Sequence, residues 1–266
     1  MELLPPDDQP PVASRTPTAG DRLKQALAPV VGVAVTLGKF GAVLFKLKAF
    51  TVVLSMVVSL GAYALIYGWR FALGLVLLIF VHEIGHVVVL RARGIEAGLP
   101  VFLPFLGAFV SMKSAPRSVY DEALSGIAGP VFGVAAAFAC LGLGAVTDSE
   151  LLRVLAYSGF LLNLFNLLPV LPLDGGRTVG ALSPRIWGLG LVALLAYEVV
   201  RPSPVIPIIL LLGAVELYRR WKGRNTEASR AYFTLAPQQR LQIGGAYAGL
   251  IVVILWAMHT YPLPPR

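Results

Sequence analysis

The stretch at 71–90, FALGLVLLIFVHEIGHVVVL, is long enough to cross a lipid bilayer as a helix and carries three ionisable side chains near one end. These are His82, Glu83 and His86. Because positions four residues apart lie on one face of a helix, both imidazoles can bind one metal ion, with Glu83 beside them. Ionisable groups are costly to place in an apolar span, and where they occur they indicate a functional site. We therefore treat this segment as the centre of the protein.

The rest of the sequence has the composition of an integral membrane protein. Hydrophobic residues make up 57% of the 266 residues and charged residues only 14%, whereas soluble globular proteins carry roughly a quarter charged residues. The net charge of +8 does not indicate nucleic acid, because the cations lie between apolar spans as the positive-inside rule predicts. The one cysteine, Cys140, lies in an apolar run. We interpret it as a packing residue and exclude a disulfide framework.

Hydropathy predicts an all-α polytopic membrane protein, a bundle of about seven to eight transmembrane helices. In addition to 71–90, the expected spans are 49–67, 123–146, 151–171, 186–200, 204–218 and 243–261. Residues 27–45 are apolar but contain Lys39, so they either cross the bilayer or lie in its interface as an amphipathic helix. We expect residues 1–22 to form a disordered tail and residues 23–266 a single membrane-embedded domain with its core at about 50–220.

The segment 98–112, GLPVFLPFLGAFVSM, is apolar yet too short to cross a bilayer. Pro100 and Pro104 oppose a helix, and the sequence PFLG at 104–107 favours a turn. We therefore predict a re-entrant β-hairpin beside the metal helix, whose backbone must be satisfied by protein or by a water-filled cavity. The alternative is a surface loop that dips into the interface.

The distribution of Lys and Arg predicts which side of the membrane the site faces. With the loop after Leu90 placed in the cytoplasm and the spans alternating from there, fourteen cations lie inside and four outside. This is the bias that the positive-inside rule predicts. At a rise of 1.5 Å per residue, His86 lies about 7 Å and His82 about 13 Å along the helix from Arg91. We expect a multi-pass protein of a prokaryotic cell membrane with its site toward the cytoplasmic side.

Two histidines leave a catalytic zinc site incomplete, because such sites use three protein ligands and a water. The remaining histidine, His259, lies near the expected outer end of the last span, so a carboxylate is needed as the third ligand. The candidates at membrane depth are Asp174, Glu198 and Glu216. Glu198 lies near the outer end of its span. Glu216 precedes a basic pair by one helical turn and is more simply interpreted as a salt-bridged interfacial residue.

Asp174 is the favoured third ligand. It follows the segment NLLPVLPL at 166–173, in which Pro169 and Pro172 break the helix, and the glycine pair after it allows a sharp turn. Broken helices at membrane depth expose unpaired backbone groups and occur where something is bound. By the charge count this span ends on the same side as the histidines. The alternative interpretation is a helix-cap or turn aspartate.

Taken together, the two motifs resemble the site-2 protease family of intramembrane zinc metalloproteases. His82-Glu83-Ile84-Gly85-His86 is followed by Asn166-x-x-Pro169-x-x-Pro172-Leu173-Asp174-Gly175 in the order typical of that family. Between them, Gly126-Ile127-Ala128-Gly129-Pro130 is similar to the family's middle-span signature. The resemblance covers about residues 50–220. It is that of a compact member without a PDZ-like insert between the motifs or a nucleotide-sensing module.

The resemblance implies that Zn²⁺ is bound by His82, His86 and Asp174, with Glu83 as the catalytic base. It also implies that Asn166 helps to position the substrate, and that the 98–112 hairpin holds a substrate strand by its edge. The implied reaction is hydrolysis of a peptide bond in or near a transmembrane segment. The implied partners are a transmembrane protein substrate and the lipid bilayer.

Two other functions remain open. The same ligands would suit a metal-binding or transport protein, although a permeation path would need a relay of ligands through several spans, and the chain has only three histidines. The second alternative is a non-proteolytic scaffold that uses zinc structurally. Glu83 distinguishes these functions, because only proteolysis requires a base beside the ligands.

Overall fold

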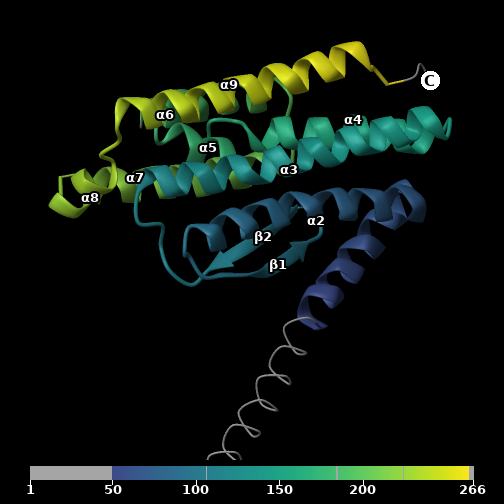
Figure 1. Cartoon of the computed structure of the whole chain (residues 1–266), viewed down its shortest axis with the longest axis horizontal. Helices are drawn as coiled ribbons and strands as arrows, with labels where there is room; N and C mark the ends of the chain where they lie inside the picture. The colour runs from purple at the N-terminus through teal and green to yellow at the C-terminus, as the bar shows by residue number, and fades with distance from the viewer. Residues whose placement is uncertain (1–49, 106, 184, 224, 264–266) are drawn as a thin grey trace, which may run out of the picture. The chain divides into compact units, whose positions relative to one another are not determined.

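A computed structural model of the chain describes residues 50–105, 107–183, 185–223 and 225–263 (Figure 1). After a first helix at Phe50–Tyr67, the elements are, in chain order, α2 Trp69–Ala92, β1 Ala97–Leu103, β2 Gly107–Met112, α3 Val119–Val146, α4 Glu150–Asn166, α5 Asp174–Val179, α6 Arg185–Val200, α7 Ile206–Gly223, α8 Glu227–Tyr232 and α9 Pro237–Thr260. The expected tail at 1–22 and the undecided segment at 27–45 lie outside the described residues.

Four of the described helices are long and apolar enough to cross a membrane: the first helix, α2, α3 and α9. Together with the apolar composition, they make the chain an integral membrane protein. The expected seven to eight spans are not confirmed. Two of the expected spans are short, because α4 has 17 residues and α6 has 16, whereas a helix that crosses a bilayer needs about 20.

The long helices pack side by side around α3. In Figure 1, α2 lies along one side of α3, while α4 and α9 lie along the other. Glycines allow this close approach. A Cβ atom at Gly85 of α2 would lie 2.5 Å from the Ala128 carbonyl oxygen of α3, and one at Gly133 of α3 would overlap the Asn163 side chain of α4. Small residues at helix contacts are the usual means of close packing in membranes.

The predicted β-hairpin is confirmed, and it packs on α2 (Figure 1). β1 and β2 pair antiparallel from Pro100↔Val110 to Leu103↔Gly107. Hydroxyl groups of the first helix hold the outer edge of β1 and the turn: the Phe102 N–H donates to Ser55 Oγ and the Phe105 N–H to the Tyr63 hydroxyl, both at 3.2 Å. The Phe102 N–H therefore points away from β2, and the backbone of Pro100, two residues earlier, faces the same way. A proline at this position costs the β1–β2 pair no hydrogen bond. The depth of the hairpin in the bilayer stays a prediction.

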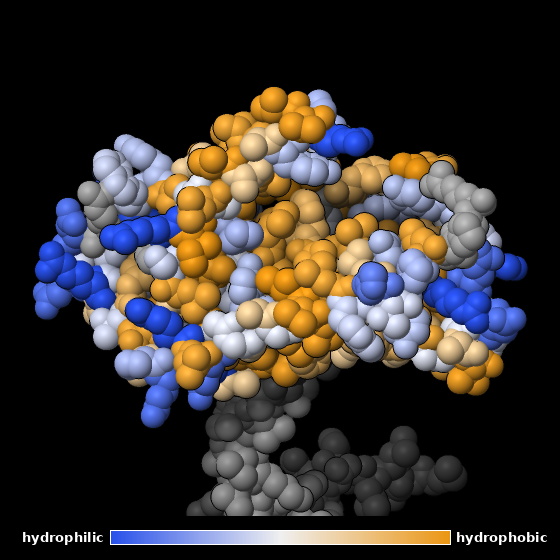
Figure 2. All heavy atoms as spheres, turned by 90° about the horizontal axis from the view of Figure 1, so that it is seen from above, coloured by the Kyte–Doolittle hydropathy of each residue, from blue (hydrophilic) through white to orange (hydrophobic). Residues whose placement is uncertain are grey.

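The face of the molecule seen in Figure 2 is apolar across its middle, and hydrophilic residues gather toward the left and right ends of the view. The horizontal direction of this view is that of Figure 1, along which α2, α3 and α9 run. An apolar band between two polar ends is the pattern expected of helices that cross a bilayer and end in water on each side.

A buried ion-pair cluster ties α3, α6, α7 and α8 together. Arg220 donates to both carboxylate oxygens of Glu122, with Nη1 3.0 Å from Oε2, and its Nε donates to Glu216 at 2.9 Å. Its guanidinium lies 4.9 Å from the Trp187 ring centroid. The Tyr232 hydroxyl donates to Glu122 at 2.6 Å, and burial and this carboxylate raise the pKa of Tyr232, so that the phenol remains a donor.

The variant Arg220→Met should destabilise the protein by about 3–5 kcal/mol, because it leaves the buried Glu122 carboxylate without its cationic partner. The measurement is the free energy of unfolding of the full chain in detergent micelles. Adding Glu122→Gln to Arg220→Met should recover most of the loss. As a control, Arg153→Met removes an arginine whose partner Asp148 is 89% exposed and should cost less than about 1 kcal/mol. An equal cost for both arginines would contradict the cluster's role.

Candidate metal centre

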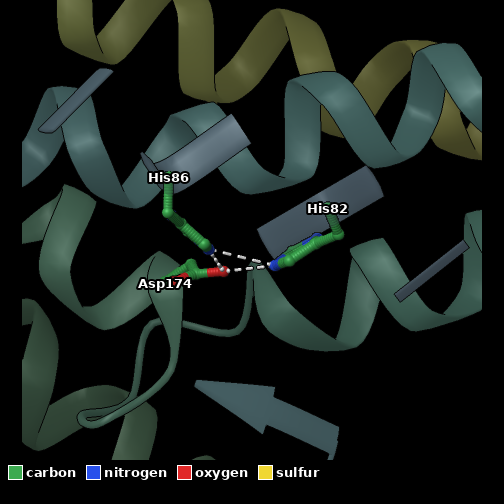
Figure 3. A group of neighbouring side chains, drawn as sticks. All are labelled: His82, His86 and Asp174. Atoms are coloured by element: carbon green, nitrogen blue, oxygen red, sulfur yellow. Dashed lines mark hydrogen bonds and ion pairs between the residues drawn. The ribbon is translucent and has the colours of Figure 1, made fainter. Parts of the chain in front are cut away.

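The site begins with one face of α2. His82 and His86, four residues apart, are 3% and 5% exposed, and their Nε2 atoms lie 3.2 Å from each other. Figure 3 shows both rings turned toward the same point. The spacing that the sequence predicted as a metal-binding pair therefore places two imidazole nitrogens together at a buried position.

Asp174 completes the group from a distant part of the chain. α4 ends at Asn166, and the loop that contains Pro169 and Pro172 leads to α5, which begins at Asp174. The glycines that follow serve for close packing: a Cβ atom at Gly175 would overlap the Leu167 carbonyl and one at Gly176 the Val170 backbone. α5 thus lies against the loop that precedes it. The Asp174 carboxylate is aimed at the two rings (Figure 3).

The three donor atoms fit a tetrahedral zinc ion. Asp174 Oδ2 lies 3.0 Å from His82 Nε2 and 3.2 Å from His86 Nε2. A tetrahedral zinc about 2.0–2.1 Å from each donor separates its donors by about 3.3 Å, so the triangle needs little adjustment. A Cβ atom at Gly129 of α3 would overlap both rings, at 2.7 Å from His82 Nε2 and nearer still to His86, so glycine keeps this space open. His82, His86 and Asp174 are positioned to bind a metal ion.

Hydrogen bonds to the far side of each ring direct Nε2 toward the metal position. His86 Nδ1 lies 2.6 Å from the Ser125 carbonyl oxygen, which can only accept, so Nδ1 carries the proton. His82 Nδ1 lies 2.8 Å from Asn163 Oδ1, and the Asn163 amide is oriented by donation from Nδ2 to the Gly159 carbonyl at 2.7 Å. In both rings Nε2 is therefore left with its lone pair, as metal ligation requires.

The two other predicted site residues, Glu83 and Asn166, both line the cavity beside the ligands. Glu83 is 5% exposed and lines the same cavity as the three ligands. Asn166 also lines this cavity, and its Nδ2 donates to the Leu162 carbonyl at 3.2 Å. The carboxylates set aside as ligands are used elsewhere: Glu198 accepts the Ser203 N–H, and Glu216 accepts from Arg220. Among the described residues, His82, His86 and Asp174 are the one group of ligands close enough for a metal.

The cavity beside the metal position has a volume of about 490 Å³ and lies between the hairpin, α2, the end of α4, α5 and α7. Its walls are mostly apolar, with aromatic rings from Phe105, Phe109 and Phe165. Its acidic and basic side chains are those of the three ligands, Glu83 and Arg177, and Arg177 Nη1 lies 3.9 Å from Asp174 Oδ1. The cavity is large enough to admit water and a short stretch of extended polypeptide to the ligands.

Sequence reasoning missed two polar residues near the centre, Asn163 and Arg177. Asn163 precedes Asn166 by one helical turn, so only the rotation of α4 decides which of the two meets His82. Arg177 follows Asp174 by three residues and therefore lies on the same face of α5. From the sequence, Arg177 is one of the fourteen cations expected on the cytoplasmic side. Its spacing from the predicted ligand was the available signal.

Comparison with known protein families places this site in context. The model of peptidase family M50 matches residues 70–150, which include His82, Glu83 and His86 and end before Asp174. This segment of the chain is similar to peptidase family M50. The match supports the predicted resemblance to the site-2 protease family.

Two relatives from Methanocaldococcus jannaschii illustrate the extent of the similarity. A zinc metalloprotease of that organism is 30% identical over 115 residues, which are 41% of this chain and 33% of the relative. The matched part thus spans about a third of the relative's length. The solved structure of a site-2 protease from the same organism aligns with a TM-score of 0.41 and 22% identity, covering 70% of this chain and 89% of that one.

The variant Gly129→Ala should lose most of its bound zinc, because the added methyl group would overlap both metal-binding rings. The measurement is the zinc content per chain after dialysis against a weak chelator. Gly142→Ala serves as the control, since it lies on the same helix and a Cβ atom there meets nothing within 4 Å. Retention of zinc by Gly129→Ala at the level of Gly142→Ala would contradict the proposed position of the ion.

The variant Asn163→Leu should weaken zinc binding by roughly 10- to 100-fold, because the buried His82 Nδ1–H loses its acceptor and the ring its orientation. Zinc affinity is measured by competition with a chromophoric chelator. Asn166→Leu is the matched control, because the Asn166 amide donates to its own helix and makes no hydrogen bond to a ligand among the described residues. Equal affinities of the two variants would show that Asn163 does not orient His82.

Proposed function

We propose that the protein is an intramembrane zinc metalloendopeptidase that hydrolyses a peptide bond in or near a transmembrane segment of a membrane-protein substrate. The observation that carries this proposal is the meeting of His82, His86 and Asp174 on one side of a cavity that also contains the Glu83 carboxylate. Three ligands and an adjacent base are the composition of a hydrolytic zinc site. The match of residues 70–150 to the model of peptidase family M50 supports the same reaction.

Glu83 is the proposed general base and acid. Zinc, when bound by His82, His86 and Asp174, would supply a Lewis acid for the substrate carbonyl and lower the pKa of water. Glu83 takes a proton from the attacking water as its oxygen bonds to the carbonyl carbon. It then gives the proton to the amide nitrogen as the C–N bond breaks. The second proton of the water then passes from the new carboxyl group to the amine, so hydrolysis leaves a carboxylate on one fragment and an ammonium group on the other.

β2 is the proposed docking strand for the substrate, through the edge that faces away from β1. Ala108 and Val110 pair with Phe102 and Pro100 at positions where the β1 backbone points outward, so their own N–H and C=O groups also point away from β1. Both residues line the cavity of the metal site. A substrate helix must unwind before its carbonyl can be attacked, and pairing with β2 would satisfy the backbone groups that it releases. Asn166, on the same cavity, is proposed to position the substrate.

We further propose that the protein lies in a prokaryotic cell membrane and acts on a transmembrane protein; the charge bias of the sequence supports a site that opens toward the cytoplasm. The alternatives of metal transport and of a structural zinc site have less support. A transport path needs further ligands along the membrane, and the described part of the chain offers one such group. A structural zinc site fills its coordination with protein ligands, whereas this one lies open to a cavity.

The variant Glu83→Gln should lower the rate of proteolysis by roughly 10²- to 10⁴-fold or more, because the amide cannot accept the proton from the attacking water. One zinc per chain should remain bound. Membrane-protein fragments are compared by proteomics between cells that carry the wild-type chain and cells that carry the variant. Glu198→Gln is the control: among the described residues the Glu198 carboxylate accepts the Ser203 N–H and no other hydrogen bond, so this variant should leave cleavage unchanged. Full activity of Glu83→Gln on a reconstituted substrate would overturn the mechanism.

A further inference from the structure

Arg177 is the one Lys or Arg among the described residues that line the cavity of the metal site. It lies on α5, one helical turn after Asp174, and its side chain is 19% exposed. Its neighbours hold it at the metal end of the cavity. Nη2 donates to Ser125 Oγ at 3.1 Å and lies 3.7 Å from Met112 Sδ, at the last residue of β2.

The guanidinium of Arg177 has donors that the described residues do not use. Its nearest carboxylate oxygen is Asp174 Oδ1, 3.9 Å from Nη1, which is too far for a hydrogen bond. Within the described part of the chain, its Nη1 and Nε groups make no hydrogen bond. Arg220 provides the contrast, because three of its nitrogens donate to carboxylates. Arg177 is therefore a fixed cation whose remaining N–H groups are available to an oxygen anion in the cavity.

The proposed reaction produces such an anion beside it. As the water oxygen bonds to the carbonyl carbon, negative charge develops on the carbonyl oxygen. After the C–N bond breaks and Glu83 returns its proton to the leaving nitrogen, the second proton of the water passes from the new carboxyl group to the amine, so a negative charge again lies on the product carboxylate. A guanidinium matches a carboxylate with two parallel N–H donors. Preorganised donors at such an oxygen stabilise the transition state.

We infer that Arg177 is a further catalytic residue of this site, which binds the oxygen of the cleaved carbonyl as it becomes negative and holds the carboxylate of the N-terminal product. This inference rests on the proposed function. A role limited to orienting Asp174 is the competing explanation. The two differ in what the residue contacts: a substrate oxygen in the first case and only the metal ligand in the second.

The test compares two small probes on the full chain loaded with Co²⁺, whose visible absorption reports binding at the metal. The probes are acetyl-leucyl-phenylalanine with a free carboxylate and the same peptide as its C-terminal amide. The quantity measured is the ratio of the two affinities, so that attraction between carboxylate and metal is common to all variants. The variants are Arg177→Gln, Arg177→Lys and, as a control, Arg153→Gln at an exposed ion pair.

Arg177→Gln should lower the preference for the carboxylate probe by roughly 10- to 100-fold, since hydrogen bonds to charged groups are the stronger kind. Arg177→Lys should keep part of the preference and Arg153→Gln all of it. Cobalt and zinc affinities should change less than about threefold, and kcat for a cleaved substrate should fall by roughly 10²- to 10³-fold at nearly constant KM.

An unchanged probe preference in Arg177→Gln would overturn the inference, as would a loss of metal affinity large enough to account for the loss of activity. Neither result would bear on proteolysis itself, because probe and metal binding are measured without cleavage. Conversely, failure of the wild-type chain to cleave any membrane protein would refute the proposed function.

Discussion

The structure depends on the meeting of one carboxylate oxygen with two imidazole nitrogens inside a membrane protein. Asp174 is 92 residues from His82 along the chain, yet Oδ2 lies 3.0 Å from that ring. Burying a carboxylate and two imidazoles is unfavourable unless each has a partner, and a shared cation satisfies all three. This constraint explains why α3 carries a glycine against the rings and why α5 packs so closely on the loop that precedes it.

Much of this centre could be predicted from the sequence because the determining signals are local. The four-residue spacing of His82 and His86 fixes a shared helix face. Pro169 and Pro172 end α4 where an unbroken helix would have carried Asp174 away from the rings. The two prolines of 98–112 excluded a helix, and the hairpin follows, with Pro100 at a ladder position that needs no N–H.

The parts that were not predicted depend on tertiary packing. Asn163 and Asn166 differ by one helical turn, and only the packing of α4 against α3 decides that Asn163 meets His82. The ion pair between Arg220 and Glu122 joins residues 98 positions apart, so no local pattern indicates it. The expected seven to eight spans stay a prediction, because four of the described helices are long and apolar enough to cross a membrane while α4 and α6 have only 17 and 16 residues.

The most direct test of the account is X-ray absorption at the zinc edge of the purified, zinc-loaded chain. The account predicts one zinc per chain with two imidazole nitrogens and oxygen ligands at about 2.0–2.2 Å and no sulfur. In the variant Asp174→Asn the zinc content per chain should fall, although both histidine ligands are still present. A zinc–sulfur distance of about 2.3 Å, or full retention of zinc in Asp174→Asn, would contradict the assignment of these three residues as the metal ligands.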